Sequence, residues 1–220
     1  MCCFNRAENL KLSSCIRATK ALAIKGIMNA KFFKKLGGES IYSVETSKVN
    51  VKEPETKFHF RKPNKEDGAP VWELVKQTGV LDLNSSYSYI MWCEIFSETS
   101  IVAEREGKIV GFISGFIHPD TRDTLFIWQV AVNESEQGQG LATKMLFELL
   151  NRDFDQQLDY LEATVSPSNT PSNHLFWGLA NKLESNCVIS DYILAEDFPN
   201  EEEDHEEEIL FRIGPIKLQK

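Results

Sequence analysis

Apolar and polar residues follow one another with two different spacings along most of the chain, and the two spacings predict a mixture of strands and helices. Residues 58–61 alternate apolar and polar positions, which is typical of a short strand. Residues 67–78 repeat apolar side chains at helical spacing and end at Gly79, a common helix stop. The predicted elements are, in order, a strand at 58–61, helices at 67–78 and 86–96, strands at 100–104, 108–117 and 124–132, a helix at 138–151, a strand at 158–165, a helix at 171–183, a short strand at 188–189 and a strand at 208–213.

This order of elements predicts one α+β domain over residues 58–220, built on a mixed sheet with flanking helices. The helix at 138–151 has a continuous apolar side, which is typical of a helix that covers a sheet. That side consists of Leu141, Ala142, Met145, Leu146, Leu149 and Leu150.

Residues 1–57 carry no comparable pattern. A basic stretch over residues 16–36 could form an amphipathic helix, although Gly26 interrupts it. Three interpretations stay open for the whole segment: a disordered extension, a translation start near Met28, or a targeting peptide, since the segment is rich in Lys and poor in acidic residues. A secretory signal is not expected, because no sustained apolar stretch follows a positively charged start. We therefore expect an extension that is separate from the domain at 58–220.

Charge is divided unevenly between these two parts. The chain has 24 Lys and Arg against 33 Asp and Glu, a net charge of −9. Residues 1–57 hold 11 basic and 5 acidic residues, a net of +6, whereas residues 58–220 hold 13 and 28, a net of −15. A domain this acidic is not expected to bind nucleic acid. No apolar run approaches the roughly 20 residues that a membrane-spanning helix needs, so no membrane partner is expected either.

The cysteines indicate free thiols. They form no C-x-x-C pair and no metal-ligand spacing with the four histidines, so we expect no bound metal. Free thiols suit a reducing, cytoplasmic compartment. The five residues are Cys2, Cys3, Cys15, Cys93 and Cys187.

The segment from residue 128 to residue 142, WQVAVNESEQGQGLA, joins a buried strand to a helix through a glycine-rich turn. Such a turn presents free backbone N–H groups at a helix N-terminus, where the helix dipole also favours an anion. Gly138 and Gly140 would let the backbone approach a phosphate closely. By themselves, two glycines before a helix indicate only a structural loop. The segment is neither a P-loop nor a Rossmann fingerprint, because no G-K-S/T follows and the glycine spacing differs.

The spacing Gln137-x-x-Gly140-x-Ala142 resembles the Q/R-x-x-G-x-G/A signature of the GNAT acetyltransferase superfamily, and the order of elements over residues 58–214 resembles that family's topology. The resemblance implies a GNAT fold, with a splayed pair of parallel strands in a mixed central sheet, and acetyl-CoA as co-substrate. It also implies that the loop holds the pyrophosphate and that backbone groups of the preceding, bulged strand hold the pantetheine arm. The implied CoA-binding residues are Val130, Ala131, Val132, Gln137, Gly138, Gln139, Gly140, Leu141, Ala142, Asn169 and Phe176.

Four longer stretches resemble a narrower family, the 2,4-diaminobutyrate acetyltransferases that begin ectoine synthesis. They are residues 82–89 (DLNSSYSY), 123–132 (DTLFIWQVAV), 164–169 (TVSPSN) and 205–215 (HEEEILFRIGP). This resemblance implies transfer of acetyl from acetyl-CoA to the Nγ amine of L-2,4-diaminobutyrate, in a homodimer. The segment before Phe58 has no expected counterpart in the family.

A diamino acid carries up to two ammonium groups and one carboxylate, so its site needs carboxylates, an aromatic wall and hydrogen-bond donors. The positions that match the family's substrate pocket are Asp82, Tyr87, Trp128, His205 and Glu208. The resemblance implies that Asp82 and Glu208 hold ammonium groups and that Trp128 lines the cleft beside the thioester.

Each of these residues also has a plainer structural interpretation. Asp82 could cap the second helix, and the two aromatic residues could pack in the core. His205 and Glu208 lie in an acidic run that would ordinarily be a solvated loop, and we leave residues 201–203 of that run as surface. Only their joint occurrence within the family pattern favours a substrate pocket.

The expected chemistry is direct acylation of an amine, because no Cys occupies a motif position. Many GNAT enzymes place a Tyr seven residues after the Asn that starts the last long helix, where it protonates the departing thiolate. Here Asn169 is followed at that distance by Phe176, so the proton has to come from water, substrate or another side chain. Glu208 is the candidate for deprotonating or orienting the reactive ammonium, with His205 second.

Two alternatives stay open. The first is a GNAT enzyme for another cationic amine, such as a polyamine, an ornithine-like amino acid or a protein lysine. The second is a CoA-binding regulatory module without turnover, which a complete polar pocket would argue against.

Overall fold

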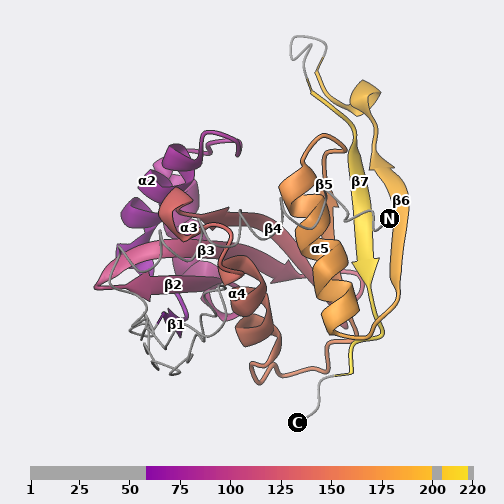
Figure 1. The fold of residues 1–220 in the computed structure, drawn as a ribbon, viewed down its shortest axis with the longest axis horizontal. Helices are drawn as coiled ribbons and strands as arrows, with labels where there is room; N and C mark the ends of the chain where they lie inside the picture. The colour runs from indigo at the N-terminus through magenta and orange to yellow at the C-terminus, as the bar shows by residue number, and fades with distance from the viewer. Residues whose placement is uncertain (1–57, 200–204, 218–220) are drawn as a thin grey trace, which may run out of the picture. The chain divides into compact units, whose positions relative to one another are not determined.

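Seven strands of one open sheet organise the described part of the chain, residues 58–199 and 205–217 of a computed structural model (Figure 1). The strand order is β1-β2-β3-β4-β5-β7-β6, and all neighbours are antiparallel except β4 and β5, which are parallel. The predicted mixed sheet is thereby confirmed. The strands are β1 His59–Arg61, β2 Ile101–Arg105, β3 Lys108–Ile117, β4 Thr124–Val132, β5 Tyr160–Val165, β6 Cys187–Ile193 and β7 Glu208–Ile213.

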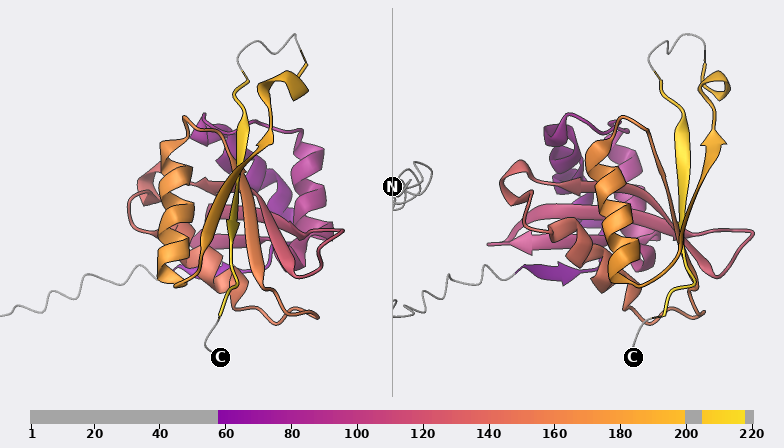
Figure 2. Two further views of the ribbon diagram at one scale, coloured as in Figure 1. Left: turned by 90° about the vertical axis from the view of Figure 1, so that its right-hand side faces the viewer. Right: turned by 45° about the vertical axis from the view of Figure 1, so that its right-hand side comes forward.

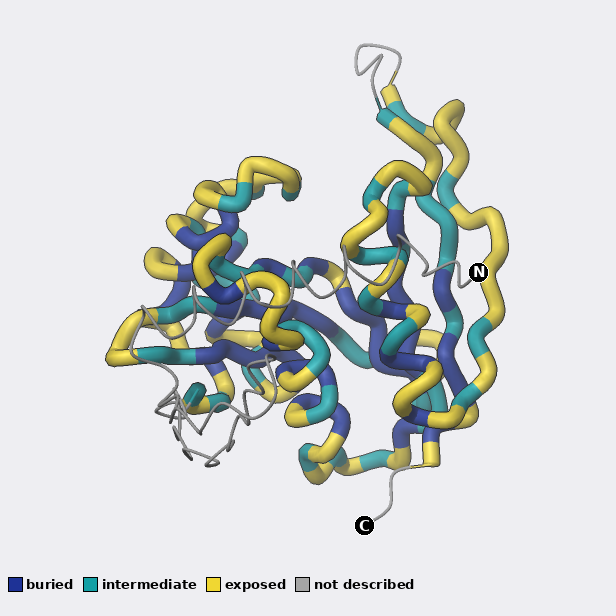
Figure 3. The backbone as a smooth tube through the Cα atoms, in the orientation of Figure 1, coloured by how far each residue is buried: buried dark blue, intermediate teal, exposed yellow. Residues whose placement is uncertain are grey.

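Helices cover both faces of this sheet. The helices α2 and α3 pack on one face, against a cluster that includes Val102, Phe112 and Ala131 of the sheet. The helices α4 and α5 cover the other face and enclose the larger core (Figure 3). The helices are α2 Gly68–Thr78, α3 Ser86–Ile95, α4 Leu141–Leu150 and α5 Thr170–Lys182, with 3-10 turns η1 Lys65–Asp67, η2 Ser97–Thr99, η3 Glu134–Glu136 and η4 Ala195–Asp197.

Two expected boundaries differ from the structure by three residues or more, and the others differ by at most two. The helix expected from residue 138 begins at Leu141, because Gly138 and Gly140 have left-handed φ values of 74° and 72° that a right-handed helix does not contain. The short strand expected at 188–189 extends over the whole of β6. Most of β6 is exposed on both faces at the sheet edge, so its sequence does not show the alternation that marks a half-buried strand.

The parallel pair separates part of the way along. Residues Thr124–Ile127 of β4 pair with Tyr160–Ala163 of β5, and the rest of β4 has no partner on that side. On its other side β4 continues to pair with β3, but the register shifts so that Trp128 has no opposite residue. Trp128 is therefore the extra residue of a β-bulge, as expected from the resemblance.

The strands β6 and β7 form an arm that projects past the ends of the other strands (Figure 2). Glu208 and His205 lie on the β7 side of this arm, and the segment from Cys187 to Phe198 lies on the other side. None of the helices formed by residues 58–199 and 205–217 has the length and apolar character needed to cross a membrane.

Several expectations concern residues outside the described ones. These are the basic segment at 1–57, the surface assignment of Glu201, Glu202 and Glu203, and the free thiols of Cys2, Cys3 and Cys15. The boundary between an extension and the domain at 58–220 likewise stays a prediction. Within the described part, Cys93 and Cys187 are both free cysteines.

Candidate active site

A pocket of about 630 Å³ lies where β4 and β5 separate, and this volume is in the range typical of small-molecule sites. Five parts of the chain contribute to it: the loop between α2 and α3, the end of β3 with the turn that follows it, the bulge of β4, the end of β5 with the start of α5, and the β6–β7 arm. The polar and aromatic residues that line it include Asp82, Asn84, His118, Trp128, Gln129, Ser166, Asn169, Phe176, Tyr192, Phe198, His205 and Glu208.

Glu208 is held in this pocket by the register between β5 and β7. Val165 of β5 pairs with Ile209 of β7. Because the two strands are antiparallel, Ser166, which follows Val165, lies beside Glu208, which precedes Ile209. The Ser166 hydroxyl donates a hydrogen bond of 2.7 Å to Glu208 Oε1. Glu208 is only partly buried, and among the described residues its second carboxylate oxygen forms no hydrogen bond or ion pair with a protein group, so it can face a ligand in the pocket.

His205 enters the pocket from the same side of the arm. Its ring stacks on Phe198, with centroids 4.0 Å apart and an angle of 9° between the ring planes. This contact joins the two sides of the arm, because Phe198 follows β6 and His205 precedes β7. His205, Phe198 and Glu208 thus form one wall of the pocket.

Trp128 forms an aromatic wall. Its ring stacks on Trp92 of α3 at a centroid distance of 6.2 Å, and Trp92 also contacts Phe96 and Phe116. Trp128 is nevertheless 53% exposed, so it is not the core residue of the plainer interpretation. An indole face that is both fixed and accessible suits an ammonium group.

The loop between α2 and α3 contributes Asp82 and Asn84 but not Tyr87. Ser85 is the N-cap of α3 and accepts a hydrogen bond from the Ser88 amide, so Asp82 does not serve as the cap. Tyr87 is 67% exposed and is not among the residues that line the pocket. The buried residues of α3 are Tyr89 and Cys93, and Tyr87 lies on another side of the helix.

The glycine-rich loop leaves the first turn of α4 open. Gly140, the N-cap, offers no side-chain cap, so the leading amides from Leu141 onward are free to bind an anion. A Cβ added at Gly138 or Gly140 would meet no atom within 4 Å, so the glycines are required by their left-handed φ. The approach to the loop is accessible as well, since Gln137, Gly138, Gln139 and Gly140 are all exposed.

An ion pair with a buried carboxylate anchors the start of this loop. Glu136 is 4% exposed, and both of its carboxylate oxygens accept hydrogen bonds from Arg105 of β2, at 2.9 and 2.8 Å. Gln139 contacts Glu136 Oε2 at 3.4 Å, and the Gln137 side chain donates to the Val132 carbonyl at 3.3 Å. Sequence reasoning missed Glu136 and Arg105, because neither belongs to the glycine signature.

The other residues expected to bind CoA flank the separation of the strands. Val130, Ala131 and Val132 belong to the part of β4 that β5 does not pair with, which leaves backbone groups available to a ligand. Asn169 caps α5 by accepting a 3.1 Å hydrogen bond from the Ser172 amide. Phe176 is 3% exposed, lines the pocket and packs against Phe211. This position is consistent with the expected contact to the pantetheine arm of CoA.

Neither described cysteine is poised as a nucleophile. Burial raises the pKa of the Cys93 thiol to about 12, so the thiolate is scarce at neutral pH. Burial also raises the pKa of Cys187, which lies on β6. This supports direct transfer to the amine without an acyl-cysteine step.

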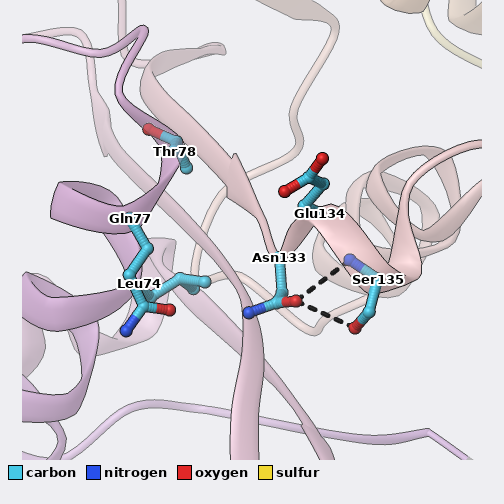
Figure 4. Close-up of a pocket in the computed structure, with 6 residues that line it drawn as sticks. All are labelled: Leu74, Gln77, Thr78, Asn133, Glu134 and Ser135. Carbon is cyan, nitrogen blue, oxygen red and sulfur yellow. Dashed lines mark hydrogen bonds between the residues drawn. The ribbon is translucent and has the colours of Figure 1, made fainter.

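A second hollow, of about 660 Å³, lies beside the turn that follows β4 (Figure 4). It is lined by the end of α2 and by Asn133, Glu134 and Ser135. Asn133 Oδ1 is already engaged there, accepting hydrogen bonds from the Ser135 amide and hydroxyl at 3.1 and 2.8 Å. The pocket at the β4–β5 separation is the candidate active site instead, because titratable and aromatic groups from five segments converge on it.

Several pocket residues were not singled out from the sequence. Asn84 and Ser166 lie inside stretches that carry the family resemblance, so that signal could have found them. His118 lies in the turn after β3 and Tyr192 lies in the edge strand β6, and neither belongs to a stretch that carries the family resemblance. Within residues 58–199 and 205–217, no group of three or more His, Cys, Asp and Glu side chains is placed to hold a metal ion.

Comparison with known proteins agrees with this geometry. The acetyltransferase (GNAT) family matches residues 69–178. An L-2,4-diaminobutyric acid acetyltransferase from Oceanobacillus iheyensis is 59% identical over 165 residues, which cover 74% of this chain and 91% of that protein. The solved diaminobutyrate acetyltransferase EctA from Paenibacillus lautus, in complex with its substrate L-2,4-diaminobutyric acid and coenzyme A, superposes with a TM-score of 0.69. It is 43% identical, over 75% of this chain and 99% of that one.

A further relative extends the similarity beyond the described residues. An L-2,4-diaminobutyric acid acetyltransferase from Halalkalibacterium halodurans is 43% identical over 188 residues, covering 86% of this chain and 96% of that protein. That length exceeds the 163 residues from Phe58 to Lys220, so the match reaches into residues 1–57. The expectation that this segment has no counterpart in the family is therefore wrong for at least part of it. The chain belongs to the GNAT acetyltransferase family and groups there with the L-2,4-diaminobutyric acid acetyltransferases.

Proposed function

We propose that the protein acetylates the Nγ amine of L-2,4-diaminobutyrate, using acetyl-CoA, by direct attack of the amine on the thioester. The observation that carries the proposal is the convergence of two carboxylates, Asp82 and Glu208, with the exposed face of Trp128 in one pocket beside the separated strands. Two negative groups and an aromatic face suit a small molecule with two ammonium groups. The names of the relatives, and the ligands of the Paenibacillus lautus enzyme, support the same substrate.

Asp82 and Glu208 have different tasks in this mechanism. Asp82 lies on the loop between α2 and α3 and holds the end of the substrate that does not react, with Asn84 as a donor for the substrate carboxylate. Glu208, on the opposite side of the pocket, receives the reactive ammonium. The span between the two carboxylates then determines which amine reaches the thioester.

Glu208 orients the reactive amine and takes up its proton, directly or through water, with His205 as the second candidate. An alkyl ammonium has a pKa near 10, so a carboxylate is a weak base for it, and the site has to favour the neutral amine. Ser166 supports this task, because its hydrogen bond to Oε1 fixes the carboxylate and leaves Oε2 for the substrate.

The acetyl thioester supplies the acyl group. The free amides at the start of α4 bind the pyrophosphate, and the unpaired edge of β4 around Val130, Ala131 and Val132 holds the pantetheine arm. A backbone N–H of the same edge stabilises the negative charge that develops on the carbonyl oxygen during attack. Phe176 packs beside the arm, and a water molecule or the substrate itself provides the proton for the thiolate.

The decisive experiment identifies the product. Incubation with diaminobutyrate and acetyl-CoA, followed by fragmentation in a mass spectrometer, should give Nγ-acetyl-diaminobutyrate as the main product. Ornithine, spermidine and a lysine peptide serve as competing substrates under the same conditions. Activity on diaminobutyrate no higher than on ornithine or spermidine would favour the alternative, a GNAT enzyme for another cationic amine.

The proposal extends to the setting of the reaction. Acetylation of diaminobutyrate is the first step of ectoine biosynthesis, and the free thiols suit a cytoplasmic location. A homodimer is supported by the edge strand β6, which exposes Val188, Ile189 and Tyr192 and has unpaired backbone groups on its outer side. Light scattering on the purified protein should then give twice the chain mass of 25.1 kDa.

A further inference from the structure

The loop that carries Asp82 and Asn84 is tied to the sheet by two buried polar side chains that have no part in the chemistry. We propose that Gln129 of β4 and Tyr89 of α3 are positioning residues, which hold this loop at a fixed distance from Glu208 and so set the length of diamine that the enzyme accepts. The inference rests on the proposed function, since it assumes that Asp82 binds the far end of the substrate.

Three hydrogen bonds form the connection. The Tyr89 hydroxyl donates to Gln129 Oε1 at 3.2 Å, and Gln129 Nε2 donates to the Asp82 backbone carbonyl at 2.9 Å. The Asn84 amide in turn donates to the Tyr89 hydroxyl oxygen at 3.4 Å. Both ends of the chain of hydrogen bonds thus lie on residues that line the pocket.

The direction of this chain of hydrogen bonds is determined by its ends. A backbone carbonyl only accepts, so the Gln129 amide must present its NH₂ group to Asp82 and its oxygen to Tyr89. Tyr89 is fully buried and Gln129 is 9% exposed, so water cannot readily replace a lost partner. Removal of either side chain leaves a buried polar group without a hydrogen-bonding partner. The free-energy cost of that unpaired group exceeds the net stabilisation that the hydrogen bond provided.

The β-bulge explains why Gln129 is available for this role. Successive residues of a regular strand point to opposite faces, yet Trp128 stacks on Trp92 and Gln129 bonds to Tyr89, both residues of α3. The register shift at Trp128 permits this, because the extra residue of a bulge redirects the side chains beside it. One backbone irregularity therefore places both the aromatic wall of the pocket and the anchor of its loop.

The consequence for specificity follows from the two ends of the pocket. Glu208 is held by Ser166 and by the β5–β7 register, so its position does not depend on the loop. If the loop moves, the span from Asp82 to Glu208 varies, and a longer diamine such as ornithine fits more easily. The two positioning residues should therefore affect discrimination by substrate length and leave acetyl-CoA binding unchanged.

The test compares Gln129→Met, Gln129→Glu and Tyr89→Phe with Ser114→Ala as a matched control. Met preserves length but removes both hydrogen bonds. Glu retains the acceptor for Tyr89 and loses the donor to Asp82, so it isolates the contact to the loop. Ser114 is the register partner of Gln129 and is fully buried, but its hydroxyl has no hydrogen-bonding partner among the described residues, so its loss should leave the loop in place.

We expect both Gln129 variants to raise KM for diaminobutyrate by about tenfold and to reduce the preference for diaminobutyrate over ornithine, with KM for acetyl-CoA within about twofold of the wild type. Tyr89→Phe should act in the same direction, and its effect should not add to that of Gln129→Met, because the two residues act through one connection. Ser114→Ala should match the wild type. Variants that lose thermal stability without a change in KM for diaminobutyrate or in the substrate preference would overturn the proposal.

Hydrogen exchange provides a readout that does not depend on the substrate. The peptide covering residues 80–85 should exchange faster in both Gln129 variants than in the wild type and Ser114→Ala, while peptides of α4 stay unchanged. Unchanged exchange at residues 80–85 would refute the positioning role, whatever the kinetics. A wild type without activity on diaminobutyrate would instead refute the proposed function, and the exchange rates would still decide whether the loop is held in this way.

Discussion

Glu208 shows how a single carboxylate in an acidic run acquires a special environment. Its neighbours Glu206 and Glu207 are exposed, whereas Glu208 begins β7 and receives a hydrogen bond from Ser166. Hydrogen bonds from the Ser168 side chain and amide lower the pKa of Glu206, but that residue does not line the pocket. Position in the strand therefore separates Glu208 from the surrounding acidic residues.

Substitution at Glu208 should affect turnover far more than binding of acetyl-CoA. In Glu208→Gln the size is kept but the charge and the proton acceptor are lost, so kcat/KM for diaminobutyrate should fall by about a thousandfold. Trp128→Ala should also remove most of the turnover, because it deletes the aromatic wall. Steady-state kinetics with both substrates, together with calorimetry of CoA binding, measure these effects.

Glu207→Gln is the matched control, since it removes one charge from the same run at an exposed position outside the pocket. It should retain wild-type kinetics. Near-normal rates in both Glu208→Gln and Trp128→Ala would contradict the assigned pocket.

At the scale of elements, the connection from β4 to α4 unites three features in one short segment. The strand loses its β5 partner after Ile127, the turn is anchored by Glu136, and the helix begins without a side-chain cap. An uncapped helix start would ordinarily be a defect, because its amides lack partners. In the proposed CoA site, the same amides would provide the groups that bind the pyrophosphate.

Gly140→Ala should therefore weaken acetyl-CoA binding specifically. An L-residue with positive φ is strained, so the variant should lose about 1 kcal/mol of unfolding free energy or distort the loop, and KM for acetyl-CoA should rise. Gly79→Ala is the control, because Gly79 at the end of α2 also has a left-handed φ, 64°, and open space for a Cβ. It should lose similar stability with KM for acetyl-CoA unchanged; equal effects of the two variants on that KM would argue against the loop as the CoA site.

At the scale of the whole domain, one arginine joins the first strand to the rest of the fold. Arg61 of β1 donates two hydrogen bonds to Asp67, at 2.6 and 2.8 Å, and also binds Glu104 of β2. Burial by itself raises the pKa of Asp67, but hydrogen bonds from Arg61 and the Asn64 amide outweigh it, and the net shift is downward. The hydrogen bond from Arg61 also lowers the pKa of Glu104.

These shifts predict a loss of stability in acid. A carboxyl group whose pKa is lower in the folded state stabilises the fold above its unfolded pKa, near 4, and that contribution disappears as the pH falls through the folded pKa. The free energy of unfolding should thus be steady between about pH 6 and pH 7 and decrease below about pH 5. Denaturant titrations at a series of pH values measure it.

Arg61→Met should destabilise the domain by about 2 kcal/mol at pH 7, because it leaves the buried Asp67 without its partner. The difference from the wild type should shrink toward pH 4, where the carboxyl groups of the variant become protonated. Lys62→Met is the control, since the pair between Lys62 and Glu98 is largely exposed and should contribute little. A difference that is independent of pH would contradict this account.

Much of the fold was predictable because its signals are local. The apolar side of α4 and the end of α2 at Gly79 are each determined by residues a few positions apart. The proposed CoA loop also has a local signal, since a helix N-terminus preceded by glycines is a short continuous segment. Other features could not be predicted from local signals. The helix α4 starts later than expected because of two backbone φ values, and β6 is longer than expected because β7 pairs with it along its length.

The sequence by itself determined the order of elements and the glycine loop, and the family pattern pointed to four residues that line the candidate pocket. Only the tertiary structure decided that Asp82, Trp128, His205 and Glu208 share one pocket and that Tyr87 does not line it. It also decided that Ser166 meets Glu208 and that Gln129 meets Asp82, over separations of 42 and 47 residues. The periodicity of apolar residues indicates which face of a helix or strand is buried. Contacts between elements depend instead on the register of the strands and on the bulge in β4, and both arise only when strands that are distant in sequence pair.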